Sequence, residues 1–335
     1  MPRAGDRIET GRLMQLLFSG AMPGREEIRG VRAVLGILEA GTGRIIHWCE
    51  YSTPRELRAP RQKMQFTGYS LVGDQIYVCS HSEIVRFTSW PPTEPADRIS
   101  VPGFNDLHHC IPWQDGLAVA NTGLETVDHV SLDGELIHRW DLLEGHSQAR
   151  RIDPDLDYRQ IEDTKPHLVH ANHLWVRNGE LWVTELKARR AVRLTGDPGQ
   201  INFETGMPHD GRQVGDRLAF TTVNGTVVLV DPDTLDVVAR HDLQEMTPGA
   251  RTLGWCRGVC ADWRHPSRFF VAFSMVRRSP WREYGFWINN GHKKVPSRID
   301  LYDVESREMV ERYVITERQS LVLFQLDALP EHLWV

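Results

Sequence analysis

A turn followed directly by a strand recurs along this chain, and this recurrence narrows the folds that the chain can adopt. The turns centre on Gly73, Gly116, Gly179 and Gly215, and each leads into an alternating apolar stretch, as in VRNGELWV. Each repeat then closes with a segment such as LDGELIHRWDL or PDTLDVVARHDL. A single unit of this kind cannot bury both of its faces, so it must pack against copies of itself. The pattern predicts an all-β fold, a β-propeller.

Two further units complete the expected ring. A fifth copy begins at SRFFVAFS and, after an insertion, resumes at SRIDLYDVESREMVERYVI. A sixth unit can be built from LMQLLFSG and residues 31–50, with its remaining strand supplied by SLVLFQLDAL near the C-terminus. We therefore expect one domain over residues 1–335 with six four-stranded blades, in which N- and C-terminal strands close the ring.

Three histidines fall near the start of successive innermost strands. His109 lies seven residues before Gly116, while His173 and His209 each lie six residues before the glycines of their own turns. Equivalent positions of neighbouring blades converge on the propeller axis. We therefore predict that His109, His173 and His209 bind one metal ion and leave coordination positions open for catalysis. The alternative for each residue is a buried histidine that bonds a backbone carbonyl.

The stretch KPHLVHANHLWV spaces His167, His170 and His173 three residues apart, which by itself is typical of a helical ligand set. Because NGELWVTE follows as a strand, we interpret the stretch as the end of a loop that enters an innermost strand. His170 is predicted to be a catalytic acid or base, a fourth ligand or a partner that orients a ligand. His108 is predicted to point away from His109 and to be structural, since side chains alternate along a strand.

Charged residues beside these histidines also have two interpretations. Asp106 and Asp210 either orient an imidazole through its N–H or cap a turn. Arg257, near the equivalent position of the fifth unit, is predicted to act in catalysis and to bind an anionic group of the substrate.

Two long insertions, residues 143–167 and 276–297, fall in loops on the same face as the strand starts. Loops of this length usually serve a function. We expect them to form a lid over the axial face, and the alternative is a surface that binds another subunit. The second insertion is rich in aromatic residues that we predict to contact substrate, namely Trp281, Tyr284, Phe286 and Trp287.

The segments LEAGTGRII and DPDTLDVV resemble outer blade strands of six-bladed propellers. The similar families are gluconolactonases, paraoxonases, strictosidine-synthase-like proteins and arylsulfotransferases. The resemblance to the lactonase group implies an axial metal held mainly by carboxylates and asparagines, whereas this chain offers histidines. Carotenoid-cleaving oxygenases are similar in placing histidine-ligated iron on a propeller axis, although with a different number of blades and four histidines.

These features predict a metal-dependent enzyme for a small organic substrate. Imidazole ligands favour Fe(II) or Cu, and an oxygenase or oxidase is then expected. With Zn or Mn, the same site would support a hydrolase or lyase. Two alternatives remain: a metal-free transferase or hydrolase in which His109, His170 or His209 is the general base, and a scaffold that binds a protein.

Composition and charge limit the binding partners and cellular locations that we expect for this chain. The net charge of −6 gives no general affinity for nucleic acid, and the apolar runs are too short for a transmembrane helix. The five cysteines are odd in number and scattered, which favours reduced thiols and a cytoplasmic protein. LMQLLFSG follows Asp6 and Glu9 and is interrupted by Gln15, so we interpret it as a strand and not as a signal peptide.

Overall fold

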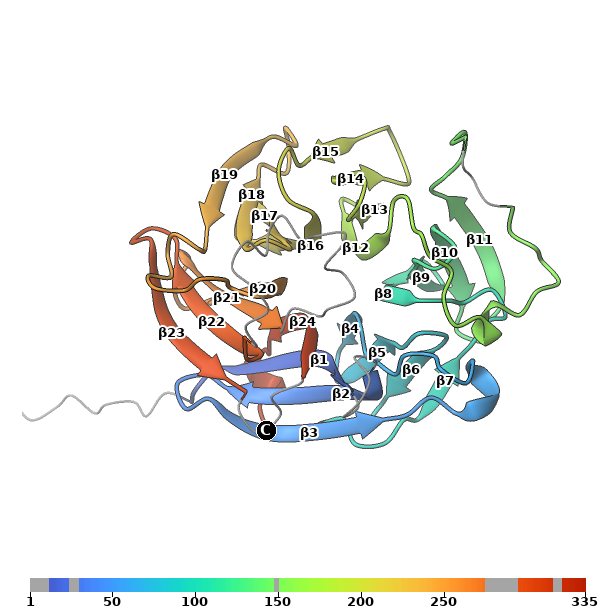
Figure 1. The fold of residues 1–335 in the computed structure, drawn as a ribbon, viewed down its shortest axis with the longest axis horizontal. Coiled ribbons are helices and arrows are strands. Elements are labelled where there is room, and N and C mark those ends of the chain that lie inside the picture. Colours follow the sequence, from blue (N-terminus) through green and yellow to red (C-terminus); the bar gives the residue numbers. More distant parts are fainter. Residues whose placement is uncertain (1–11, 24–29, 148–150, 275–294, 316–320) are drawn as a thin grey trace, which may run out of the picture.

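The computed structural model describes residues 12–23, 30–147, 151–274, 295–315 and 321–335. Their strands form six four-stranded antiparallel sheets, which surround a central axis as the blades of a propeller (Figure 1). The prediction of a six-bladed all-β propeller is confirmed. Helix in the described residues is limited to short 3₁₀ turns: Arg55–Leu57, Tyr158–Gln160 and Glu331–Leu333.

Blades 2 to 6 follow the chain, and each runs from its innermost to its outermost strand. Blade 2 contains β4 (Tyr69–Val72), β5 (Gln75–Cys79), β6 (Ile84–Phe87) and β7 (Asp97–Ile99). Blade 3 contains β8 (Leu107–Trp113), β9 (Gly116–Asn121), β10 (Thr126–Ser131) and β11 (Leu136–Asp141). Blade 4 contains β12 (Ala171–Arg177), β13 (Glu180–Glu185), β14 (Arg190–Arg193) and β15 (Gln200–Asn202).

Blade 5 contains β16 (Pro208–Val214), β17 (Arg217–Thr222), β18 (Thr226–Val230) and β19 (Val237–Asp242). Blade 6 contains β20 (Trp255–Ala261), β21 (Arg268–Ser274), β22 (Arg298–Asp303) and β23 (Glu308–Val314). Blade 1 joins both ends of the chain, in the order β24 (Val322–Ala328), β1 (Gln15–Pro23), β2 (Gly30–Glu39) and β3 (Arg44–Tyr51).

Ring closure occurs as the sequence predicts. The C-terminal strand β24 pairs antiparallel with β1, and Figure 1 shows it as the innermost strand of a blade that otherwise comes from the start of the chain. The segment that begins LMQLLFSG is therefore a strand of the ring.

The hydrophobic core is divided among the contacts between blades. In the described residues, six buried clusters each take side chains from two adjacent blades. Along β1, Leu16 and Phe18 belong to the cluster shared with blade 6, whereas Leu17 belongs to the cluster shared with blade 2. This alternation is the period of two that the sequence pattern implied.

The inner strands begin on one side of the disc, here named the entrance face, and their first hairpin turns lie on the other side, the exit face. Gly73, Gly179 and Gly215 have φ of +63°, +77° and +56° in those turns, a left-handed conformation that favours glycine. These three turn positions are therefore confirmed, whereas Gly116 is the first residue of β9 and the turn before it lies at Gln114, with φ +50°.

The first insertion packs over the entrance face of blades 2 and 3. Tyr158 donates its backbone N–H to the carbonyl of Pro102 over 2.8 Å, and Asn105 donates a side-chain N–H to the carbonyl of Tyr158 over 2.7 Å. Of the second insertion, residues 276–294 lie outside the described residues, so the predicted lid over the axis stays a prediction. None of the described helices has the length and apolar character needed to span a membrane.

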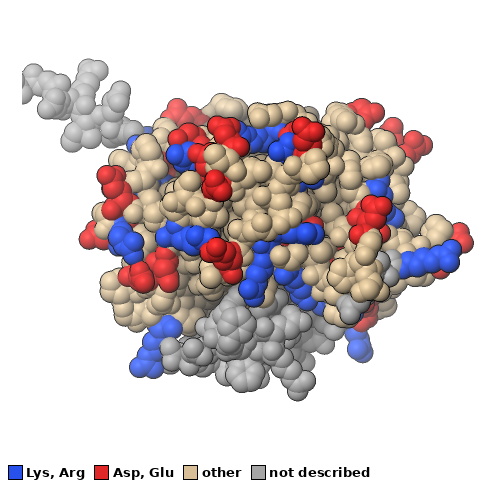
Figure 2. Space-filling view, turned by 90° about the horizontal axis from the view of Figure 1, so that it is seen from above, with Lys and Arg blue, Asp and Glu red and all other residues tan. Residues whose placement is uncertain are grey.

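Charges of both signs are interspersed around the rim of the disc, as Figure 2 shows for one side. Some of these charges pair between neighbouring blades, for example Arg177 with Asp233 over 2.5 Å. Exposed pairs of this kind add little stability, about 0–1 kcal/mol each.

Candidate axial active site

The inner strands carry irregularities close to the axis. The pairing of β8 shifts at His108, and the pairing of β12 shifts at Asn172. In β16 the shift comes later, at Gly211. A bulge leaves one residue unpaired and redirects its side chain. His108 consequently does not alternate away from the axis as the sequence predicted. It lines the axial space instead, where it joins Asn172.

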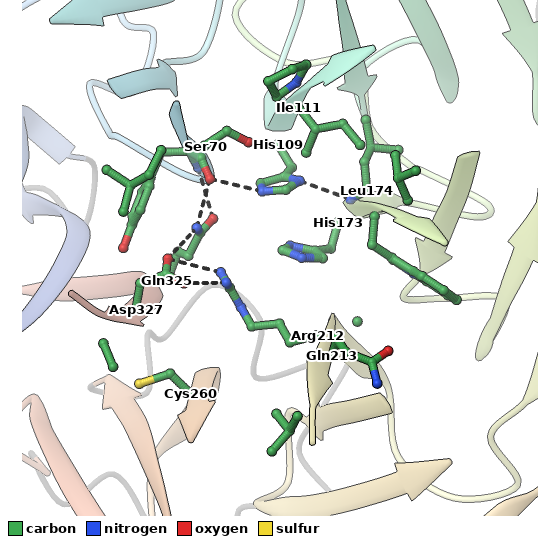
Figure 3. Close-up of a pocket in the computed structure, with 18 of the residues that line it drawn as sticks. Ser70, His109, Ile111, His173, Leu174, Arg212, Gln213, Cys260, Gln325 and Asp327 are labelled. Atoms are coloured by element: carbon green, nitrogen blue, oxygen red, sulfur yellow. Dashed lines mark hydrogen bonds and ion pairs between the residues drawn. The ribbon is translucent and has the colours of Figure 1, made fainter. Parts of the chain in front are cut away.

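The bulges also place the three predicted metal ligands at two levels. His109 and His173 stack, with ring centroids 3.9 Å apart and planes 22° apart, and both line a pocket that opens on the exit face (Figure 3). His209 lines a much smaller cavity toward the entrance face, and His173 forms part of its wall too. The spacing from the turn glycines implied that the three histidines lie at the same level along the axis. The structure corrects this, because counting residues along a strand does not reveal a bulge.

His109 is bonded to the backbone through both ring nitrogens. Its Nδ1 accepts the N–H of Leu174 over 3.0 Å, and its Nε2 donates to the carbonyl of Tyr69 over 3.2 Å. Burial, with a contribution from the charge of Arg212, lowers the pKa of His109 to about 3. His109 thus connects blades 2, 3 and 4 as a neutral imidazole and retains no lone pair for a metal ion.

The predicted three-histidine centre does not fit the side chains as they lie. His109 has no free ring nitrogen, and His209 faces a different cavity. In the part of the chain that the structure describes, no three His, Cys, Asp or Glu side chains are arranged to hold a metal ion.

The cavity near the entrance face, here named the cup, has a volume of about 20 Å³, which is room for one water-sized atom. Asn172 donates to Nδ1 of His209 over 3.0 Å, so the ring proton of His209 is on Nε2. In the described residues, this buried Nε2–H has no hydrogen-bond acceptor, and Oδ1 of Asn172 has no donor. The cup therefore contains unused polar groups, which favours a polar occupant.

Arg257 supplies a positive charge to the same cup. Its guanidinium carbon lies 5.0 Å from the ring centroid of Trp255 and 4.7 Å from that of Phe324, and the residue is only 9% exposed. Burial lowers the pKa of His209 well below its ordinary value, and the charge of Arg257 adds to this effect. Arg257 thus occupies the axial position that the sequence predicted for it.

A carboxylate and two imidazoles meet beside the cup. Oδ1 of Asp106 lies 3.5 Å from Nδ1 of His81 and 3.8 Å from Nε2 of His108. Burial raises the pKa of Asp106, but Lys63 and the two histidines outweigh it, and the net pKa lies well below the ordinary value. Burial lowers the pKa of His108 to about 3, although Asp106 opposes this. An ionised carboxylate therefore lies next to a neutral imidazole.

His170, predicted to be catalytic, lies against His108. The two rings are perpendicular, with centroids 4.7 Å apart. Nδ1 of His170 is 3.2 Å from Nδ1 of His167, whose Nε2 is in turn 3.2 Å from the hydroxyl of Thr164. Burial lowers the pKa of both His167 and His170. We name His81, Asp106, His108, His167 and His170 the entrance cluster.

Glu125 fixes the loop that carries two of these histidines. Its carboxylate accepts the backbone N–H groups of Leu168, Val169 and His170 over 2.6–2.9 Å. This set of bonds holds His170 at φ +57°, a conformation uncommon for residues other than glycine. The position of the His170 ring therefore depends on blade 3 as well as on its own loop.

The sequence did not identify His108 and Asp106 as principal site residues. The tandem histidines of NDLHHC were visible, but strict strand alternation assigned only one of them to the axis. The predicted substrate contacts Trp281, Tyr284, Phe286 and Trp287 lie outside the described residues.

Comparisons with known proteins identify the fold. No family model matches the chain, and no curated protein matches its sequence. A protein of unknown function from Bacteroides caccae is similar with a TM-score of 0.60 and 11% identity, covering 95% of this chain and 100% of that one. A structure of a nidogen/laminin complex has a TM-score of 0.55 and 12% identity over 94% and 98% of the two chains. A catalytically inactive virginiamycin B lyase from Staphylococcus aureus is similar with a TM-score of 0.47 and 12% identity, covering 75% of this chain and 70% of that one. At 11% and 12% identity, the first two of these likenesses support the fold alone.

Proposed function

We propose that this chain is an enzyme that performs general acid–base chemistry on a small organic anion, one oxygen of which occupies the cup. The observation that carries the proposal is a neutral imidazole, His108, that lies beside an ionised carboxylate and lines the cup together with N–H donors. An enzymatic base needs a proton-accepting form at working pH, an orienting partner and a bound substrate nearby.

His108 is the proposed base. Its Nε2 faces Asp106 at 3.8 Å, so Nδ1 is the nitrogen left to accept a proton from the substrate or from an attacking water. The distance to Asp106 is long for a hydrogen bond, and such contacts commonly tighten when substrate binds. After the transfer, the Asp106 carboxylate stabilises the imidazolium.

Arg257 and His209 are proposed to hold an anionic oxygen of the substrate. The guanidinium provides charge, and Nε2–H of His209 provides a buried donor that has no other acceptor in the described residues. The charge of Arg257 also depresses the pKa of His108. An anion that neutralises Arg257 would therefore raise that pKa and make His108 a stronger base when substrate is bound.

The test follows proton exchange and turnover in D₂O by ¹H NMR, using a panel of small carboxylates, sulfate esters and phosphate esters. Wild-type protein should bind an anion and exchange or convert it, and His108→Gln should lower the rate about 10²- to 10⁴-fold. Arg257→Met should weaken anion binding. Arg264→Met is the matched control, because Arg264 stacks on the exposed Trp263 at 4.9 Å, outside the cup. Equal rates for wild type and His108→Gln would overturn the proposal.

A metal-dependent enzyme is the second candidate. The observation that favours it is the series of ring contacts from His108 to His170 and from His170 to His167. A neutral imidazole, as in His108, is the form that ligates Fe(II), Cu, Zn or Mn. These residues match a metal in donor type only, since as placed they do not form a metal site. Elemental analysis of protein purified without a nickel column separates the candidates. Stoichiometric metal that is lost in His170→Ala would favour the metal enzyme, and activity that survives strong chelators would favour acid–base chemistry alone.

A further inference from the structure

A second pocket, separate from the cup, opens on the exit face and has a volume of about 580 Å³. It is lined by the ends of all six inner strands, and Figure 3 shows these side chains pointing into a shared space. The size lies within the range of small-molecule sites, about 300–1,000 Å³. His173 and Gln325 line this pocket and also border the cup.

The described residues that line the pocket carry no net charge. Arg212 and Asp327 are the only Lys, Arg, Asp or Glu residues among the described residues of its lining, and they pair with each other through two hydrogen bonds. Gln325 also donates to Asp327, over 2.9 Å. An anion in the pocket would meet the carboxylate, and a cation would meet the guanidinium, so a charged ligand would have to disrupt the pair.

Polar and apolar groups alternate around this neutral pair. The side chains of Arg212 and Asp327 are 20% and 18% exposed, so the pair can also form hydrogen bonds with a neutral ligand. The hydroxyl of Ser70 also lines the pocket, and its proton is donated to the carbonyl of Cys110 over 2.7 Å, which leaves oxygen lone pairs as acceptors. Ile111 supplies an apolar wall, and the indole of Trp175 stacks on Trp182 with centroids 4.7 Å apart, which holds it rigidly.

We propose that this pocket binds a neutral polyhydroxylated molecule, of the chemical class of a mono- or disaccharide. Such a ligand presents hydroxyls to the Ser70 oxygen and to the partly exposed Arg212–Asp327 pair, and its C–H faces pack on Ile111 and Trp175. It brings no charge that would compete with the Arg212–Asp327 pair. The site does not depend on the acid–base function assigned to the cup, so either proposal can fail alone.

The experiment measures binding of glucose, galactose, mannose, maltose and lactose by calorimetry and ligand-observed NMR, with glucuronate and glucosamine as charged counterparts. We expect at least one neutral sugar to bind in the micromolar to millimolar range. Val176→Trp should remove this binding, because Val176 lines the pocket yet is 45% exposed, so a larger side chain fills the pocket without entering the core. Val238→Trp is the control, since Val238 is 50% exposed on the outermost strand of blade 5.

Arg212→Met supplies a second readout. Without the guanidinium, Asp327 is left as an uncompensated carboxylate, so selectivity should shift toward glucosamine by tenfold or more. Absence of binding by every neutral sugar would overturn the proposal, and so would sugar binding that is unchanged in Val176→Trp. Tighter binding of glucuronate than of all neutral sugars by wild-type protein would overturn it as well.

Discussion

Asn172 of blade 4 donates a hydrogen bond to Nδ1 of His209 of blade 5 over 3.0 Å, and this contact fixes which nitrogen of His209 carries its proton. The same amide group donates to the carbonyl of Pro208 over 2.9 Å. Because Nδ1 is occupied as an acceptor, Nε2–H is available to the cup. The bulge at Asn172 in β12 thus determines which ring nitrogen of His209 in β16 is protonated.

Asn172→Leu should remove the hydrogen bond that fixes the ring proton of His209 on Nε2. Without the amide donor, the proton of His209 can move to Nδ1, and the cup then loses an N–H donor. We expect anion affinity to fall about tenfold, which corresponds to the ~1.4 kcal/mol typical of one hydrogen bond. ¹⁵N NMR of labelled histidine reports the tautomer directly. Asn202→Leu, on the outer strand β15, should leave both readouts unchanged. A wild-type spectrum with the proton on Nδ1 would contradict the assignment.

Glu125→Gln should loosen the loop that carries His167 and His170. The carboxylate accepts three consecutive backbone N–H groups, and an amide of the same size replaces one of its oxygens by a donor. We expect a loss of about 1–3 kcal/mol in the free energy of unfolding. Urea denaturation measures it.

The control for that loop is Glu180→Gln, because Glu180 forms a half-exposed pair with Arg193 over 2.9 Å. It should cost less than about 1 kcal/mol. Equal losses in the two variants would show that the bonds of Glu125 to the loop add nothing beyond an ordinary ion pair.

The sequence predicted the fold well and the site only in part. Turn glycines and period-two alternation are local signals, so the blades, their order and the closing strand β24 could be read directly. The site depends on where bulges fall, and these are set by packing between blades. His108 and His109 exchange roles for this reason: His109, favoured as a ligand, bonds the backbone, while His108 reaches the cup.

The entrance cluster as a whole could not be predicted from the sequence, because its residues come from distant parts of the chain. His81 lies in a hairpin turn of blade 2, Asp106 directly precedes β8, and His170 ends a loop that comes from blade 3. No spacing rule joins three such positions, because the contact arises only when blades 2, 3 and 4 pack side by side around the axis. In contrast, Arg257 could be placed near the axis from the repeat alone.

Acid should destabilise the protein through its buried histidines. The pKa of His109 falls from an unfolded value of about 6.5 to about 3 in the folded protein. Between these values the unfolded chain binds the proton and the folded protein does not. Stability is therefore complete above pH ~6.5 and decreases as pH falls toward ~3, by up to about 1.4 kcal/mol per pH unit for each such histidine.

Urea denaturation at a series of pH values measures this slope. His109→Gln should reduce the slope by the contribution of one proton, whereas His138→Gln, at an exposed position on β11, should not. A slope that is identical in wild type and His109→Gln would contradict the link between acid sensitivity and this residue.

The five cysteines should be inert in the folded protein. All are free and buried, and burial raises the pKa of Cys49 to about 11, with Glu94 and Glu50 adding to the effect. Burial also raises the pKa of Cys79 and Cys256. Since the thiolate is the reactive form, Ellman's reagent at pH 8 should label none of them until urea is added. Rapid labelling of one thiol without denaturant would identify a local opening that the burial does not predict.

Gln325 should be the most sensitive polar position of the closing strand. Its side chain accepts the N–H of Tyr69 over 2.9 Å and donates to the carbonyl of the same residue over 2.8 Å. These two bonds link β24 to β4, the inner strand of blade 2. Gln325→Leu keeps the volume but leaves the N–H of Tyr69 without its acceptor, while the carbonyl of Tyr69 keeps the donor Nε2–H of His109, so the change should cost about 1–3 kcal/mol in the free energy of unfolding. Gln213→Leu is the matched control, because Gln213 is exposed and, among the described residues, its side chain bonds only the carbonyl of Gly215 in the nearby turn. If the two variants unfold at the same urea concentration, ring closure does not depend on this amide.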